Sequence, residues 1–186
     1  MPKGIPFRQS RKIWRWEFVA GFSLIHGYRY GAEIGVSTGR FTTFLCSRVP
    51  DLRMIAVDLW MPQPGNEKDP GGQSYESWPH EDHYETLKAH LEKEFPARVQ
   101  VIRECSWEAA RHCADGTLDF VFIDADHRYE SAKKDIQAWL PKVRMGGMIA
   151  GHDYEERNWP GVVQAVDELV PGAMVADDNV WFAFIK

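Results

Sequence analysis

The chain has 186 residues, 44% of them hydrophobic and 26% charged, a composition that allows one domain with a buried core. A formal net charge of −5 argues against nucleic acid as the main partner. No apolar run is long enough to cross a membrane, and no signal peptide is recognisable, so we expect a cytoplasmic protein without a membrane partner. Three cysteines in no paired pattern predict free thiols.

The N-terminal segment is expected to be a loose arm followed by a helix. Residues 1–10 are polar and contain proline. From Arg11 onward, apolar residues recur at helical spacing: Trp14, Phe18, Phe22 and Ile25. This aromatic stripe predicts a helix that packs on the core, rather than a site.

The stretch from Tyr30 to Phe41 reads as strand, glycine turn and helix. A short apolar run carries Glu33, two glycines follow at Gly35 and Gly39, and a helix is predicted to about Val49. Such a turn lies at the carboxyl end of a strand, where open α/β sheets bind ligands. Glycine allows positive φ and close approach of a ligand to the backbone.

The middle of the chain contains a second strand, a long loop and a helix. Residues 53–58 form a buried strand that ends in Asp58. Residues 60–78 are rich in Pro, Gly, Asn and Ser, and we expect a mobile loop that closes over the site as a lid. A helix over 79–95, a strand over 99–102 and a short helix near Ser106 follow.

The last third continues the alternation. A strand over 118–123 ends at Asp124, and a helix over 130–143 is expected to stop at Gly146 and Gly147. A strand over 148–150 ends before His152 and Asp153, and a helix begins near Pro160. Residues 174–176 and 180–185 then predict a terminal antiparallel hairpin.

Alternating strands and helices predict one α/β domain over residues 1–186. The expected fold is doubly wound and Rossmann-like, with a mostly parallel seven-stranded sheet and a C-terminal antiparallel hairpin. In such a sheet the carboxyl ends of the strands share one edge. We therefore expect the polar residues that follow these strands to meet there: Glu33, Asp58, Asp124, His152 and Asp153.

This arrangement suits a nucleoside cofactor. Asp58 follows Gly39 by 19 residues, which is the position of an acid that accepts hydrogen bonds from ribose hydroxyls. Trp60 and Trp107 offer flat apolar faces to an adenine ring, and Ser106 a polar group to its edge.

Three stretches resemble motifs of the class I methyltransferases that use S-adenosylmethionine (SAM): Glu33–Gly39, Ile55–Trp60 and Leu118–Tyr129. Residues 130–154 are similar to a small subfamily near the macrocin-type sugar O-methyltransferases. The resemblance covers residues 28–186. It implies methyl transfer from SAM to an oxygen, or less commonly a nitrogen, of a small-molecule or sugar acceptor.

The resemblance also implies roles for single residues. Glu33, Gly35 and Gly39 would line the methionine end of SAM, and Asp58 would bind its ribose. The adenine would lie near Cys105, Ser106 and Trp107, and the transferred methyl group near Asp124.

A catalytic centre is expected at Asp124, His152 and Asp153. In the macrocin-type relatives a divalent metal lies at these positions, but all three ligands are acids, whereas here His152 is the middle one. The set could still hold Mg²⁺, Mn²⁺ or Fe²⁺. Without a metal, Asp153 or His152 could remove the acceptor proton; His127 is a further candidate.

Other functions remain open on sequence alone. Residues 35–39 formally match the G-x-S-x-G motif, so Ser37, Asp124 and His152 could form a serine hydrolase triad. The turn follows the first predicted strand, however, and too little chain precedes it for an oxyanion loop. The glycine spacing does not fit a nicotinamide enzyme. A non-catalytic SAM-binding protein is the other alternative. Eight tryptophans suggest a binding surface or a contact in a homo-oligomer.

Overall fold

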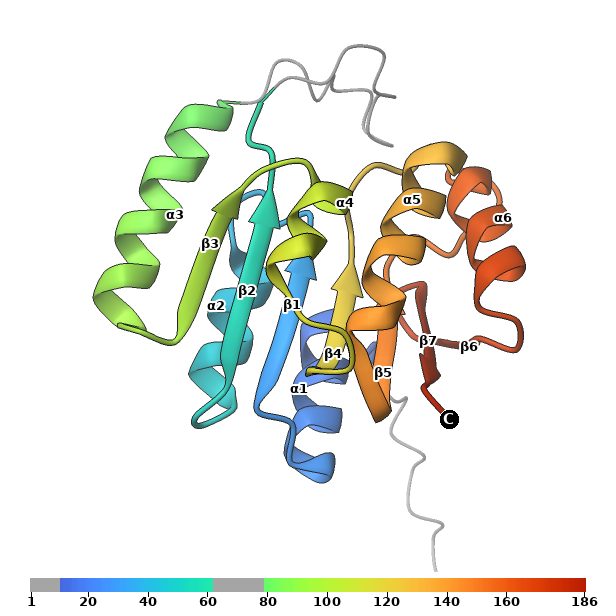
Figure 1. Cartoon of the computed structure of the whole chain (residues 1–186), viewed down its shortest axis with the longest axis horizontal. Helices are drawn as coiled ribbons and strands as arrows, with labels where there is room; N and C mark the ends of the chain where they lie inside the picture. The colour runs from blue at the N-terminus through green and yellow to red at the C-terminus, as the bar shows by residue number, and fades with distance from the viewer. Residues whose placement is uncertain (1–10, 62–78) are drawn as a thin grey trace, which may run out of the picture.

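The computed structural model describes residues 11–61 and 79–186 (Figure 1). Seven strands form one sheet in the order β3-β2-β1-β4-β5-β7-β6. Pairing is parallel from β3 to β5, whereas β7 runs antiparallel to both β5 and β6. This topology confirms the predicted Rossmann-like sheet and its C-terminal antiparallel hairpin.

The strands are β1 (Tyr30–Ile34), β2 (Arg53–Asp58), β3 (Val99–Arg103), β4 (Leu118–Ile123), β5 (Val143–Gly151), β6 (Met174–Ala176) and β7 (Val180–Phe184). The helices are α1 (Arg15–His26), α2 (Arg40–Arg48), α3 (His80–Glu94), α4 (Ser106–Ala109), α5 (Tyr129–Trp139) and α6 (Pro160–Leu169). The predicted arm over 1–10, and residues 62–78 of the predicted lid, lie outside the described residues.

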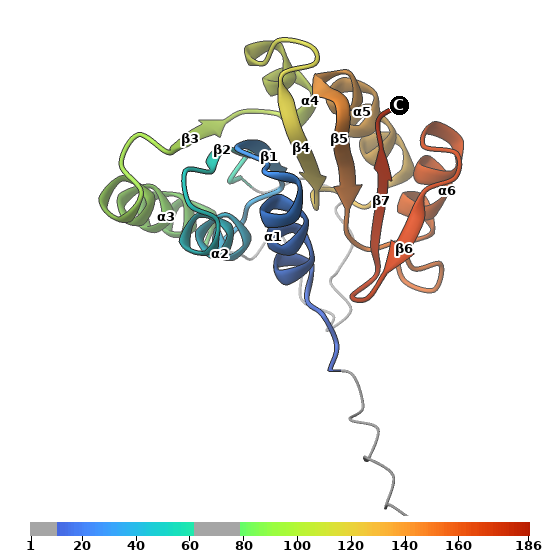
Figure 2. The ribbon, with the colours of Figure 1, turned by 90° about the horizontal axis from the view of Figure 1, so that it is seen from below.

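Helices cover both faces of the sheet. Helices α1 to α3 lie on one face and α4 to α6 on the other (Figure 2). The α5 stripe shows why: Ala132, Ile136 and Trp139 recur at helical spacing and are all buried in one core. A second core fills the opposite face, where α1 and α2 pack on the sheet. Each face of the sheet is thereby shielded from water.

Helix α1 packs through the middle of its predicted apolar stripe but not through the ends. Ile25 is 80% exposed, so the stripe does not continue to the end of the helix. Phe18 and Phe22 do pack on the hairpin, with ring centroids 4.9 and 5.8 Å from that of Phe182. The helix is therefore held against the C-terminal strands by its central turns.

The two glycines at 146 and 147 do not end helix α5. The helix ends at Trp139, a short 3₁₀ turn follows over Leu140–Lys142, and β5 begins at Val143. Gly146 has φ +74° and lies in a register shift within β5. A Cβ at Gly147 would lie 2.6 Å from the Asp119 carbonyl oxygen. The glycines thus allow a bulge beside β4, and proline in the 3₁₀ turn ends the helix.

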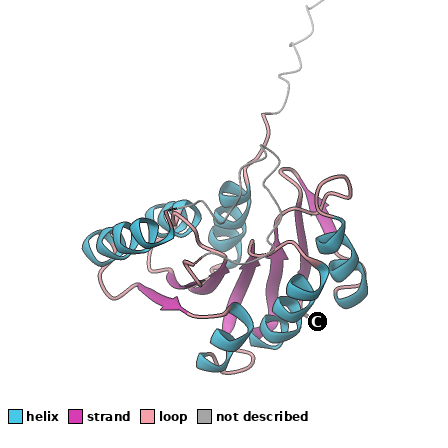
Figure 3. Ribbon diagram, turned by 90° about the horizontal axis from the view of Figure 1, so that it is seen from above, coloured by secondary structure: helices cyan, strands magenta, loops and turns pink. Residues whose placement is uncertain are grey.

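The strand order reverses direction at β1, which lies between β2 and β4. Connections from β1 and β4 leave on opposite faces, and a crevice forms where they diverge. Figure 3 looks down on this edge, with helices on either side of the sheet. The carboxyl ends of β1, β2, β4 and β5 meet here and position the site.

Gly35 is the point of closest approach between β1 and β4. Its φ is +89°, and a Cβ there would lie 2.1 Å from the carbonyl oxygen of Asp124. Its N–H donates to Val57 of β2, and the Asp124 N–H donates to Ile34. The turn is therefore held between its two neighbouring strands by backbone contacts.

Replacing Gly35 by Ala should destabilise the fold through both strain and a backbone clash. Gly172→Ala is the matched control, because Gly172 has φ +82° but nothing within 4 Å of the added Cβ. We expect the control to cost about 1–2 kcal/mol for the left-handed conformation. Gly35→Ala should cost about 1–3 kcal/mol more because the neighbouring backbone must shift. Urea unfolding measures both; equal losses would show that the close approach carries no cost.

Candidate active site

A cavity of about 1130 Å³ lies at the carboxyl edge of the sheet. Its lining includes every predicted site residue except Gly39: Glu33, Gly35, Asp58, Trp60, Cys105, Ser106, Trp107, Asp124, His152 and Asp153. Gly39 has φ +72° and precedes α2, where a Cβ would overlap the side chain of Leu87. The structure thus brings the separate motifs to one cavity, with Gly39 shaping the turn behind its wall.

Asp58 ties the glycine turn to the end of β2. One carboxylate oxygen accepts the N–H groups of Val36 and Ser37, both at 2.8 Å. The other oxygen accepts the Trp60 N–H at 2.8 Å. An ionised carboxylate has about four acceptor positions, so it can still accept bonds from a ligand. Asp58 therefore orders the turn and faces the cavity at the same time.

Trp60 is part of the cavity wall rather than of a free loop. It is 2% exposed, and its indole N–H donates to the Ser37 carbonyl at 2.8 Å. Its ring lies 5.2 Å from that of Tyr84 on α3. The first residue of the predicted lid is thus fixed by packing, while the lid from residue 62 onward lies outside the described chain.

Glu33 is a buried acid behind the glycine turn. Its carboxylate accepts the N–H of Thr42 at 3.1 Å and the hydroxyl of the same residue. Burial raises the pKa of Glu33 to about 8, against the lowering effect of the Thr42 bonds. The carboxyl group is therefore mostly neutral at pH 7.

Ser106 is held by an acid that the sequence did not single out. The Ser106 hydroxyl donates to Asp135, which is 1% exposed, and the Trp139 indole N–H donates to the Ser106 carbonyl at 3.0 Å. Burial raises the pKa of Asp135 to about 7. Asp135 lies among the apolar positions of α5. A carboxylate on the buried face of a predicted helix is the sequence feature that could have indicated its role. Trp107 remains 36% exposed at this end.

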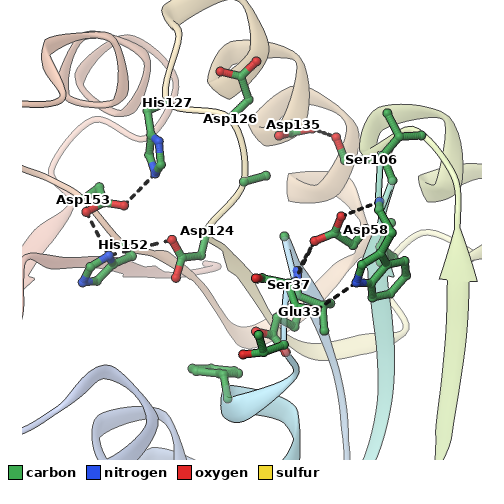
Figure 4. A pocket seen from close by; sticks show the side chains of 18 of the residues that line it. Glu33, Ser37, Asp58, Ser106, Asp124, Asp126, His127, Asp135, His152 and Asp153 are labelled. Carbon is green, nitrogen blue, oxygen red and sulfur yellow. Dashed lines mark hydrogen bonds and ion pairs between the residues drawn. The ribbon is translucent and has the colours of Figure 1, made fainter. Parts of the chain in front are cut away.

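At the opposite side of the cavity, acids and histidines form a connected row, called the acid row below (Figure 4). Its members are His127, Asp153, His152 and Asp124. His127 Nε2 lies 2.7 Å from one oxygen of Asp153, and His152 Nδ1 lies 3.0 Å from the other. His152 Nδ1 also lies 3.8 Å from Asp124. The predicted centre of Asp124, His152 and Asp153 is therefore assembled, with His127 as a fourth member.

Within the row, the pKa values of the Asp124 and Asp153 carboxylates shift in opposite directions. Burial would raise the pKa of Asp153, but hydrogen bonds with His127 and His152 outweigh it and hold that pKa well below its usual range. Burial raises the pKa of Asp124, with His152 acting in the opposite direction. Burial lowers the pKa of His152, but Asp153 and Asp124 reverse the shift to a net increase. Asp124 is thus the more basic carboxylate.

Arg15 and Asp178 also belong to this row, although no sequence pattern places them there. Arg15 Nε lies 3.3 Å from Asp124, and Arg15 Nη1 lies 3.2 Å from His152 Nε2 and 3.4 Å from Asp178. Arg15 follows Trp14 in what reads as a packing stripe. Asp178 lies 163 positions away, in the turn before β7, so no local pattern joins the two.

Left-handed backbone conformations cluster around the cavity. Ser37, Trp60 and Asp153 have φ values of +50°, +43° and +60° and are not glycine. All three line the cavity. Ser37 and Trp60 donate their backbone N–H groups to Asp58, and Asp153 is itself one of the acids of the site. Such conformations are unfavourable and persist where the surrounding structure enforces them, which is typical of functional sites.

The donor set was tested for a metal ion. Ligand atoms of Asp124, His152 and Asp153 all lie within 4.8 Å of one another, close enough to surround one ion. The Arg15 guanidinium, however, stands against Asp124 and His152 and brings a permanent positive charge to the same place. A divalent cation would have to displace this guanidinium from both groups, so the residues as arranged do not fit a metal site.

A serine hydrolase triad is not formed. Within the described residues, both ring nitrogens of His152 already face other groups, Nε2 towards Arg15 and Nδ1 towards Asp153. Ser37 is bound through its backbone to Asp58 and Trp60, on the other side of the cavity. The arrangement of Ser37, Asp124 and His152 therefore lacks the base contact that a triad requires.

A mostly parallel sheet with a glycine turn, an acid at the end of β2 and a cavity at its switch point is typical of Rossmann-like folds that bind nucleoside cofactors. Residues 32–154 match the family described as "Methyltransferase domain". The chain belongs to this methyltransferase family, as the resemblance of its motifs implies.

Several solved structures of methyltransferases have a fold similar to that of this chain. The calicheamicin methyltransferase CalS11 has a TM-score of 0.68 and 17% identity, over 90% of this chain and 76% of that one. The O-methyltransferase NovP has a TM-score of 0.66 and 16% identity, over 92% and 79%. An O-methyltransferase from Bacillus cereus, in complex with S-adenosylhomocysteine (SAH), has a TM-score of 0.64 and 18% identity, over 92% and 80%.

Two sequence relatives are longer proteins. "Uncharacterized protein y4gI" of Sinorhizobium fredii is 26% identical over 143 residues, which is 74% of this chain and 14% of the relative. "Uncharacterized protein R132" of Acanthamoeba polyphaga mimivirus is 34% identical over 79 residues, 40% of this chain and 36% of the relative. The match thus spans well under half of either relative.

The buried carboxyl of Glu33 should make stability depend on pH. Its pKa is about 8 in the fold and near 4.5 when unfolded, so the folded state alone keeps the proton between these values. The stabilisation is complete below pH 4.5 and is lost towards pH 8, by up to about 1.4 kcal/mol per pH unit. Glu33→Gln cannot ionise.

Urea unfolding of both proteins from pH 5 to 8 tests this expectation. The wild type should lose stability relative to Glu33→Gln as the pH rises, because only the wild type must hold or release this proton. Asp135 contributes with the same sign to both proteins and cancels in the difference. Parallel stability curves would mean that Glu33 is ionised in the fold.

Proposed function

We propose that this chain is a SAM-dependent O-methyltransferase acting on a small-molecule or sugar acceptor. One observation carries the proposal: a single cavity joins the glycine turn, Asp58 and Ser106 to the row that contains Asp124 and Asp153. The first group suits a nucleoside with an amino acid tail, and the second suits proton removal beside a sulfonium. Family membership and the SAH-bound relative support SAM as the methyl donor.

The cofactor would lie across the switch point. Its ribose would face Asp58, its adenine the segment from Cys105 to Trp107, and its methionine end the turn beside Glu33. This order follows the cavity from β2 to β4, so the sulfonium would come to lie near Asp124. Anionic side chains there favour the positively charged cofactor.

Methyl transfer requires the acceptor oxygen, the methyl carbon and the sulfur to lie in line. As the bond from oxygen to methyl forms, the bond from methyl to sulfur breaks, and the acceptor loses its proton. Asp124 would take that proton, because it lies nearest to the glycine turn and its carboxylate faces the cavity. His152 and Asp153 would orient it and share the charge.

The acceptor is proposed to be a hydroxyl compound of modest size. One solved relative is a TDP-rhamnose 3′-O-methyltransferase, which supports a sugar hydroxyl as the nucleophile. Trp14 and Trp16 stack at the cavity rim, with ring centroids 5.5 Å apart, and offer a flat apolar surface to such a molecule.

In the described residues, no helix is long and apolar enough to cross a bilayer. A cytoplasmic location and a homo-oligomer remain proposals.

SAM should bind with one site per chain, and Asp58→Ala should weaken it. One hydrogen bond from ribose to a charged acceptor is lost, at about 1.5–3 kcal/mol, which is about a 10- to 150-fold loss of affinity. Asp119→Ala is the matched control, because Asp119 also accepts backbone N–H bonds, from Arg29 and Tyr30, but lies at the opposite end of β4.

Calorimetric titration with SAM and SAH measures these affinities, and thermal unfolding reports stability. The control should lose stability and keep its affinity. No wild-type binding at millimolar SAM would refute the cofactor assignment. Equal loss of affinity in both variants would assign Asp58 a purely structural role.

Substitutions in the acid row should lower turnover more than they lower the affinity for the cofactor. Asp124→Asn keeps the shape of the side chain but removes the base, and should lower turnover by about 10²- to 10⁴-fold. Asp153→Asn and His152→Ala should lower it by smaller factors. SAH formation from SAM is measured with a nucleoside-diphosphate sugar and with a catechol as acceptors. Full activity of all three variants on an acceptor that the wild type methylates would place the centre elsewhere.

A further inference from the structure

Arg15 is fixed at the start of α1 by the turn before β7. The Arg15 N–H donates to Asp178 at 3.1 Å, and the Ile13 N–H donates to Asp177 at 3.2 Å. Lys12 forms an ion pair with the second Asp178 oxygen at 2.7 Å. These bonds satisfy donors at the helix N-terminus and hold the residue in place. The Arg15 side chain is thereby aimed from α1 into the acid row.

The guanidinium contacts three members of that row. It lies 3.3 Å from Asp124, 3.2 Å from His152 Nε2 and 3.4 Å from Asp178. The Arg15 side chain is only 27% exposed, and that of Asp178 only 6%. A largely desolvated cation in contact with two carboxylates is strongly held, since charges attract more strongly away from water.

This cation meets the electrostatic requirement that a metal would otherwise meet. Asp124, Asp153 and Asp178 converge on His152 and would repel one another if no positive charge lay between them. Arg15 pairs directly with the first and the third of these acids, and Lys12 reaches only Asp178. Arg15 is therefore the fixed charge that reaches Asp124.

Arg15 also determines how His152 can be used. A guanidinium has only donors, so the His152 Nε2 that faces it accepts a hydrogen bond. The proton of the neutral ring then lies on Nδ1 and is donated to Asp153 at 3.0 Å. A metal ion needs a free lone pair on one ring nitrogen. Neither nitrogen of His152 offers one in this arrangement.

We propose that Arg15 takes the place of a divalent cation in this centre: it holds Asp124 and His152 in position and makes methyl transfer independent of metal. Arg15 is a positioning residue, acting through these two side chains. The inference rests on the proposed function where it concerns turnover. Its statement about cations concerns the folded chain alone and can be tested separately.

Removing Arg15 should create a metal site. Arg15→Ala leaves Asp124, His152, Asp153 and Asp178 without their guanidinium, so Mn²⁺ should bind there. Titration with Mn²⁺ alone, followed by electron paramagnetic resonance, should show affinity at least about tenfold tighter than in the wild type. Arg11→Ala is the matched control: Arg11 is 78% exposed and pairs with Glu17, outside the cavity. The control should resemble the wild type.

Turnover gives the second readout. Wild-type SAH formation should be unchanged by a chelator, and Arg15→Ala should lose about 10²-fold, the scale of removing one preorganised donor. Arg15→Lys should recover most of that loss because it keeps the charge. Arg15→Gln repeats both measurements with the side-chain length preserved and serves if Arg15→Ala does not fold.

Two outcomes would overturn the proposal. One is tight Mn²⁺ binding by the wild type together with loss of turnover on chelation. The other is a folded Arg15→Gln or Arg15→Ala protein that binds Mn²⁺ no better than the wild type. Failure to bind SAM or to methylate any acceptor would instead refute the proposed function, and the Mn²⁺ titrations would still decide the role of Arg15.

Discussion

The site depends on the contact between the glycine turn and the end of β4. Gly35 lies so close to the Asp124 carbonyl that no side chain fits between the two backbones. The same turn is bound to β2 through the Val57 carbonyl and the Asp58 carboxylate. The groups proposed to face the cofactor and those proposed to be catalytic are therefore joined by direct backbone contacts. A rigid link of this kind would keep a sulfonium in a fixed position relative to a base.

Charge in the cavity is distributed unevenly. Glu33 and Asp135 are buried, and burial moves their pKa values to about 8 and about 7. In the row beside them, the contacts with His127 and His152 instead hold the pKa of Asp153 well below its usual range, so negative charge is retained there. SAM carries a sulfonium that SAH lacks, so this distribution attracts the substrate form of the cofactor more strongly than the product form. The same groups that stabilise the reacting complex would thus assist product release.

The sequence was most informative where structure is set by neighbouring residues. The strand ends, the glycine turn and Asp58 can be recognised from local sequence patterns. Parallel strands bring their carboxyl ends to one edge of the sheet independently of the loop conformations. The apolar periodicity predicts a helix that runs past the end of α5, because it does not take account of the stop at Pro141. The bulge in β5 depends on pairing with β4. Arg15 and Asp178 could not be paired, since their contact is set by where α1 docks on the hairpin.

That docking has a consequence for the order in which the protein forms. The contacts of Arg15 with Asp178 join positions 163 residues apart, so they close one of the longest loops in the chain. Contacts of such sequence separation form late, after the local elements have paired. During synthesis from the N-terminus, the turn before β7 emerges after the glycine turn and β2. The contact between Arg15 and Asp178 can therefore form only once the turn before β7 has been made and α1 has docked against it.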